Sequence, residues 1–157
     1  MRPRVYAETT FISYLAAKPS RDLIVAAHQQ LTRDWWESRR DEFELFVSEL
    51  VLLEASAGDP EAARRRMDEM SGIPVLALTE DARKLARELV KNGPIPRQAA
   101  ADALHIAVAA THGMDYLITW NCRHIANAEK KEAIAVRCLA MGYEPPVICT
   151  PEELMGV

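Results

Sequence analysis

One stretch of the sequence, AAADALHIAVAA at residues 99–110, is apolar on almost every side of the helix that it predicts. A helix without a polar face must be covered by the rest of the protein, so we expect this one to be buried and central. Its only strongly polar members are Asp102 and His105, which lie three residues apart and therefore share one face. A buried carboxylate is costly unless it is paired or binds a cation. Asp102 is therefore a candidate functional residue; the alternative is an Asp at the solvent-exposed end of the helix, paired with Arg97 or His105.

Short apolar stretches alternate with helical ones on both sides of this segment. We expect strands at residues 4–7, 44–47, 73–78, 115–119 and 147–149, and helices at 9–17, 20–40, from 48, from 59, 79–90, 97–112 and 129–141, with a last helical turn from 150. Glycines at 72, 93, 113 and 142 predict left-handed residues at helix ends. Strands that alternate with helices predict an α/β fold, with a parallel sheet of about five short strands covered by helices on both faces. Because no linker or repeat divides the chain, we expect a single domain over residues 1–157.

Composition and charge narrow the class of protein further. The 157 residues are 49% hydrophobic and 27% charged, as is usual for one globular domain. A net charge of −4 argues against a broadly cationic nucleic-acid binder, although a local basic patch or a metal held by carboxylates still permits such contact. Three cysteines without CxxC spacing predict neither a disulfide framework nor a zinc ribbon. With no apolar stretch long enough for a bilayer and no signal peptide, we expect a soluble, cytoplasmic protein that does not engage a membrane.

Two further acidic residues occupy positions that suggest a function. Glu8 directly follows the first expected strand, and ligands bind beyond the carboxyl ends of parallel strands. The alternative is that Thr9 or Thr10 caps the next helix and Glu8 faces its dipole. Glu54 interrupts the apolar face of the helix after the second strand, unless it lies at a boundary position near the helix end. Together with Asp102 these residues predict a cluster of carboxylate oxygens, which suits Mg²⁺ or Mn²⁺ and water activation for attack on a phosphodiester.

Four segments resemble PIN-domain proteins, and in particular the VapC-like toxins of bacterial type II toxin–antitoxin systems. They are YAETT at 6–10, SELVLLE at 48–54, ADALHIA at 101–107 and YLITWN at 116–121, and their order and spacing are similar to those of the family. The resemblance covers essentially the whole chain. It implies a three-layer α/β fold and a magnesium-dependent ribonuclease site. For the toxin branch it also implies a homodimer that a small antitoxin protein neutralises.

The resemblance also implies which residues form the site. Glu8, Glu54 and Asp102 match the family's three acidic metal ligands, and Asn121 matches the fourth position. The first and fourth positions are usually Asp in the family, so Glu8 adds a methylene and Asn121 removes a negative charge. Both departures bear on the strength of metal binding. The residues predicted to contact the substrate flank this set and are Thr9, Arg97, His105, Thr119 and Arg123.

These features predict an RNA endonuclease that uses Mg²⁺, or Mn²⁺, to activate water for phosphodiester hydrolysis, and that acts as the toxin of a toxin–antitoxin pair. One alternative is a catalytically weak PIN-fold module that binds nucleic acid or protein. Glu8 and Asn121 favour that alternative, whereas Glu54 and Asp102 oppose it, because apolar residues would be more stable there once function was lost. Another alternative is a phosphatase or nucleotidase, which would need a nucleophilic Asp where Glu8 stands.

Overall fold

A parallel sheet of five short strands forms the centre of the computed structural model, which describes residues 1–156. The strands lie in the order β3-β2-β1-β4-β5, and every neighbouring pair is parallel. Their bounds are β1 Arg4–Ala7, β2 Glu44–Ser48, β3 Val75–Leu76, β4 Tyr116–Ile118 and β5 Val147–Cys149. The predicted α/β class and the parallel sheet of about five strands are confirmed.

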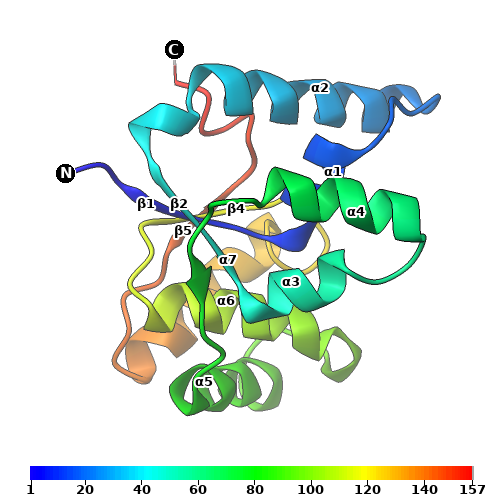
Figure 1. The fold of residues 1–157 in the computed structure, drawn as a ribbon. Helices are drawn as coiled ribbons and strands as arrows, with labels where there is room; N and C mark the ends of the chain where they lie inside the picture. The colour runs from blue at the N-terminus through cyan, green and yellow to red at the C-terminus, as the bar shows by residue number, and fades with distance from the viewer. Residues whose placement is uncertain (157) are drawn as a thin grey trace.

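Seven α-helices flank this sheet in the described part of the chain. They are α1 Thr9–Ala16, α2 Leu23–Ser38, α3 Glu49–Ala55, α4 Pro60–Glu69, α5 Glu80–Lys91, α6 Ala100–Thr111 and α7 Ala128–Ala140. Helices α1, α2 and α4 lie on one side of the sheet, and α5, α6 and α7 lie on the other (Figure 1). The three layers predicted from the sequence are therefore present.

The helix that the sequence predicts to be buried is α6. Ala103 and the residues from Ile106 to Val108 are fully buried, because α6 packs against both α5 and β4. Asp102 is an exception to the predicted burial. It lies in the first turn of α6 and is only half-buried.

Strand β1 lies in the middle of the sheet and determines where a ligand can bind. From β1 the sheet extends through β2 and β3 to one side and through β4 and β5 to the other. In open parallel sheets ligands bind at the point where the strand order reverses, outside the carboxyl ends of the strands. Here that point lies between the ends of β1 and β4. Glu8 directly follows β1, and Thr119 directly follows β4.

Some predicted boundaries are wrong. The strand expected at residues 73–78 is reduced to Val75–Leu76 at the sheet edge, and Pro74 before it has no N–H to donate. The helix expected from residue 20 begins at Leu23, because the Asp22 carboxylate accepts the Val25 N–H and caps it. The helical turn expected from residue 150 is confirmed: Thr150 and Glu153 cap each other, and the Leu154 N–H donates to the Thr150 carbonyl at 3.2 Å.

Four glycines were predicted to adopt a left-handed conformation at helix ends, and three of them do. Gly72, Gly113 and Gly142 have φ values of 81°, 69° and 90°. Gly93 does not adopt positive φ, so that prediction is wrong. It lies against the end of α5, where a Cβ atom would come within 2.5 Å of the Leu89 carbonyl oxygen. Gly93 is therefore needed for a close approach of two backbone segments.

Two further observations concern the chain as a whole. Across residues 1–156 no helix combines the length and apolar character that crossing a membrane requires. The three cysteines are free thiols; Cys122 is exposed, whereas Cys138 and Cys149 are buried.

Candidate active site

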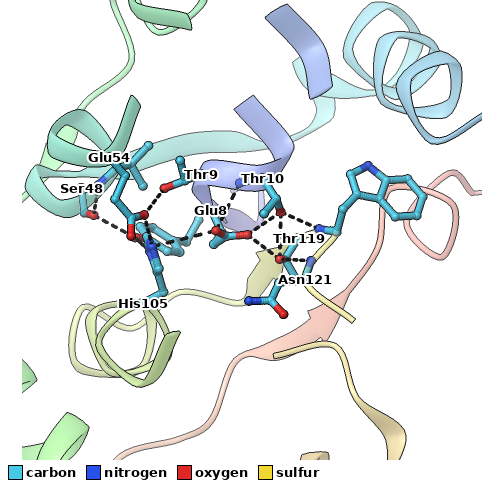
Figure 2. Close-up of polar contacts among 11 residues, drawn as sticks. Glu8, Thr9, Thr10, Ser48, Glu54, His105, Thr119 and Asn121 are labelled. Carbon is cyan, nitrogen blue, oxygen red and sulfur yellow. Dashed lines mark hydrogen bonds and ion pairs between the residues drawn. The ribbon is translucent and has the colours of Figure 1, made fainter. Parts of the chain in front are cut away.

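Glu8 places a buried carboxylate at the carboxyl end of β1 (Figure 2). It is 3% exposed and accepts hydrogen bonds from the Thr10 N–H at 3.1 Å, the Thr10 hydroxyl at 2.5 Å and the Thr119 hydroxyl at 2.6 Å. Glu8 is itself the N-cap of α1, so the alternative in which a threonine caps this helix is wrong. Among the described residues its nearest basic partner is His105, with Nε2 3.9 Å from Oε2. A buried carboxylate without a close basic partner is typical of a cation ligand.

Glu54 approaches the same point from the last turn of α3. Its side chain is 33% exposed, so it lies at the edge of the core rather than within it. Its Oε1 accepts a hydrogen bond from the Thr9 hydroxyl at 2.5 Å and lies 2.7 Å from His105 Nε2. Burial raises the pKa of Glu54, but the contacts with His105 and with the Thr9 hydroxyl outweigh burial and hold the pKa below its usual value of 4.5. Glu54 is therefore ionised at neutral pH.

His105 lies between these carboxylates and the core. It is 1% exposed, and its Nδ1 atom lies 2.7 Å from the Tyr6 hydroxyl, so both ring nitrogens have protein partners. One potential ligand atom from each of Glu8, Glu54 and His105 lies within 4.8 Å of the others. The structure thus brings together two of the predicted metal ligands and one predicted substrate contact.

Asp102 lies on the same face of α6 as His105, one turn nearer the N-terminus of the helix. Within residues 1–156 its carboxylate makes no hydrogen bond or ion pair at the distances that define the other contacts, so the alternative pairing with Arg97 or His105 is absent. It is not part of the compact group formed by Glu8, Glu54 and His105. Asp102 therefore stays a predicted metal ligand, adjacent to the cluster along α6.

Thr119 and Asn121 form the part of the site that follows β4. The Thr119 hydroxyl donates to Glu8 and accepts the Asn121 N–H at 2.9 Å. The Asn121 side-chain oxygen accepts the His124 N–H at 3.1 Å and so stabilises the turn after the strand. Asn121 thus lies at the predicted edge of the sheet, but its oxygen already has a partner.

The two arginines predicted to contact the substrate are exposed and lie outside the compact cluster. Arg97 lines a groove of about 690 Å³ between α5 and α6, together with Leu104. Residues 100 and 104 lie on a different face of α6 from Asp102 and His105, so this groove does not open onto the carboxylates. Arg123 lies two residues after Asn121 in the turn.

Sequence reasoning missed three residues that support the site. Thr10 donates twice to Glu8, and its hydroxyl also accepts the Trp120 N–H. Its place in the YAETT segment was a usable signal. Tyr6 and Ser48 also belong to the quoted YAETT and SELVLLE segments, but a tyrosine in a strand and a serine before a helix are typical of core and cap positions, so their residue types gave no signal of a role at the site.

The available donors fit a hard divalent cation. Two carboxylates converge where no lysine or arginine of the described residues pairs with them, and a third lies nearby on α6. Such oxygen donors are the ligands that Mg²⁺ and Mn²⁺ prefer.

Comparisons with known proteins agree with the observed fold. The PIN domain family matches residues 9–131. The fold is similar to that of VapBC2 from Rickettsia felis, solved bound to a DNA fragment from its promoter, with a TM-score of 0.60, 14% identity, and coverage of 94% of this chain and 98% of that one. It is also similar to VapC20 of Mycobacterium tuberculosis, a sarcin–ricin loop cleaving toxin, with a TM-score of 0.56, 17% identity, and coverage of 88% and 95%. A search of curated proteins gave no match.

The family match spans more than half of the chain, and it includes Glu54 and Asp102 as well as the turn that contains Asn121. At these identities the two solved structures add agreement in fold. This chain belongs to the PIN-domain family.

Proposed function

We propose that this protein is a divalent-metal-dependent ribonuclease and the toxin component of a type II toxin–antitoxin system. The observation that carries the proposal is the Glu8 carboxylate, which is 3% exposed, has hydroxyl donors and lies beside Glu54 where the strand order reverses. PIN-family membership supports nuclease chemistry, and the fold shared with a toxin that cleaves the sarcin–ricin loop supports RNA as substrate.

Glu8, Glu54 and Asp102, assisted by Asn121, are the residues that would hold Mg²⁺ or Mn²⁺. When bound, such a cation supplies Lewis-acid chemistry, because it lowers the pKa of water and offsets phosphate charge. The protein's own contribution is to hold the carboxylates in place. The Thr119 hydroxyl fixes Glu8, and the Thr9 hydroxyl fixes Glu54. The exposed Arg123 is a proposed phosphate contact, and Arg97, on the α5–α6 groove, is a weaker one.

The partners follow from the same proposal. RNA is the proposed substrate, and a small antitoxin is the proposed inhibitor, in keeping with the fold shared with VapBC2. The homodimer and the cytoplasmic location remain predictions from the resemblance.

A second candidate function is a catalytically weak module that binds nucleic acid or protein. One observation favours it: the Asn121 oxygen is already bonded to the His124 N–H, so the fourth ligand position is weak. The intact Glu8–Glu54 pair opposes it.

The proposal is tested by cleavage of a structured RNA with Mg²⁺ or Mn²⁺, using wild type and Glu8→Gln. We expect cleavage by wild type that EDTA abolishes, and a loss of at least about a hundredfold in the variant. The matched control is Glu132→Gln, an exposed acid on α7 that should cleave like wild type. If wild type binds RNA tightly and never cleaves it, the binding module replaces the nuclease.

A further inference from the structure

A chain of hydrogen bonds runs from the core to the candidate metal site through three buried side chains (Figure 2). The Ser48 hydroxyl lies 2.8 Å from the Tyr6 hydroxyl, which lies 2.7 Å from His105 Nδ1. His105 Nε2 lies 2.7 Å from Glu54. Ser48, Tyr6 and His105 are each at most 1% exposed, so no solvent competes for these groups. We call these three residues the relay.

The acceptors available to each hydroxyl and ring nitrogen determine where the hydrogens of the relay lie. Ser48 Oγ accepts the Val51 N–H at 3.2 Å as the N-cap of α3, so its own hydrogen is available for Tyr6. If Ser48 donates to Tyr6, and Tyr6 donates to His105 Nδ1, then His105 Nε2 carries the hydrogen that Glu54 accepts. In this direction every hydrogen has an acceptor. In the opposite direction the Ser48 hydrogen has none among the described residues, and a buried unpaired donor is costly.

The carboxylate at the end of this chain of hydrogen bonds agrees with this direction. Glu54 Oε1 also accepts the Thr9 hydroxyl at 2.5 Å, and an ionised carboxylate has no hydrogen to donate, so the nitrogen that faces it at 2.7 Å must carry one.

We propose that Ser48 and Tyr6 fix His105 as a hydrogen donor to Glu54, which makes His105 a positioning residue of the metal site. His105 is then neither a metal ligand nor the substrate contact that the sequence suggested. This inference rests on the proposed metal site. Its rival is direct ligation, since the three donor atoms of Glu8, Glu54 and His105 lie within 4.8 Å of one another. Ligation requires a lone pair on Nε2, whereas positioning requires a hydrogen there.

Imidazole ¹⁵N NMR of the metal-free protein distinguishes the two states directly. We expect His105 to show a hydrogen on Nε2 and an acceptor Nδ1, and to keep the Nε2 hydrogen when Mg²⁺ or Mn²⁺ is added at saturation; diamagnetic Mg²⁺ is the probe for the spectrum. A hydrogen only on Nδ1 in the metal-free protein overturns the proposal. So does loss of the Nε2 hydrogen when Mg²⁺ binds.

Tyr6→Phe tests whether the relay acts on the metal, because Tyr6 contacts neither carboxylate. Changes to residues that support a ligand typically cost 10–100-fold in metal affinity, and we expect at least about tenfold weaker Mg²⁺ binding by calorimetry. The control is Tyr116→Phe, on the neighbouring strand, whose hydroxyl makes no hydrogen bond within the described residues. The control should bind Mg²⁺ like wild type.

A pair of substitutions at His105 keeps the proposal testable if Tyr6→Phe unfolds. His105→Gln retains an amide donor that reaches toward Glu54, whereas His105→Leu has none. We expect the glutamine to restore most of the Mg²⁺ affinity that the leucine loses. Equal affinities in all variants would contradict the relay alone, whereas a wild type that binds no Mg²⁺ or Mn²⁺ would contradict the proposed function.

Discussion

The two sides of the candidate site hold their carboxylates by different chemistry. On the hydroxyl side, Glu8 is 3% exposed and held by the hydroxyls of Thr10 and Thr119. On the imidazole side, Glu54 is 33% exposed at its side chain and is held by His105 and Thr9. Both sides converge on one point, but only the second has an imidazole within 3 Å and keeps part of its carboxylate in solvent.

The difference indicates which side depends more on a cation. Neutral hydroxyl donors orient the charge of Glu8 without compensating it, and a buried uncompensated charge is unfavourable. Glu54 keeps part of its hydration and has His105 at 2.7 Å. We therefore expect Glu8 to be the ligand that gains most from a bound metal, while Glu54 is already in place before the metal arrives.

Metal-dependent stability gives the largest expected effect. A ligand that binds only the folded state, present at a hundred times its Kd, adds about 2.7 kcal/mol of unfolding free energy. We expect Mg²⁺ or Mn²⁺ to stabilise wild type in this way, Glu8→Gln to lose the effect, and Asp102→Asn to reduce it. Thermal unfolding with and without metal measures this. An undiminished response in Glu8→Gln would mean that the ion binds elsewhere.

The hydroxyl donors test the comparison without any metal. Thr119→Val removes a donor to buried Glu8 at nearly constant volume and should cost about 1–3 kcal/mol. Thr9→Val removes the equivalent donor to the more exposed Glu54 and should cost less than about 1 kcal/mol, because water replaces the hydroxyl. Urea unfolding of the metal-free variants measures both. Equal costs would show that burial does not separate the two sides.

The sequence predicted one side of the site better than the other. Strand periodicity and the position of Glu8 after the first strand were enough to place the hydroxyl side, because the topology of a parallel sheet brings the ends of β1 and β4 together. On the imidazole side, Glu54 and His105 were each singled out, but their contact depends on how α3 and α6 pack. No local pattern encodes that packing, and the same limit hid Tyr6.

The burial of Asp102 was predicted too strongly for a related reason. An apolar helix shows which segment is central, but not which of its turns reaches the end of the sheet. The first turn of α6 lies at that end, so Asp102 is half-buried while the following residues are covered. The length of the edge strand β3 was also predicted too generously: it comprises only Val75–Leu76, after Pro74, which has no N–H for the sheet.

Substitution of Asn121, at the fourth predicted ligand position, is expected to change the Mg²⁺ affinity by a smaller amount. Asn121→Asp keeps an oxygen that can accept the His124 N–H and adds a negative charge beside Glu8, so Mg²⁺ should bind several-fold tighter by calorimetry. Repulsion between the added carboxylate and its neighbours opposes this effect, because it would raise the pKa of one of these carboxyl groups and so favour a proton over the metal. Asn121→Ala is the control. If it binds Mg²⁺ like wild type, Asn121 is not a ligand and the site reduces to Glu8, Glu54 and Asp102.

The smallest expected effect is a pH dependence from the imidazole side. The pKa of Glu54 is lower in the folded protein than its usual value of 4.5, so the folded state favours the ionised form. Its contribution to stability is therefore fully present above about pH 4.5 and is lost as the pH falls through the lower folded pKa. The partly exposed position of Glu54 keeps this contribution to stability small.

The measurement is the unfolding free energy of metal-free wild type and of Glu54→Gln, compared between pH 7 and acidic pH. We expect the advantage of wild type to shrink below about pH 4.5, the usual value of this group. If the gap between the two proteins is the same at every pH, His105 does not stabilise the ionised carboxylate, and the two sides of the site differ only in burial.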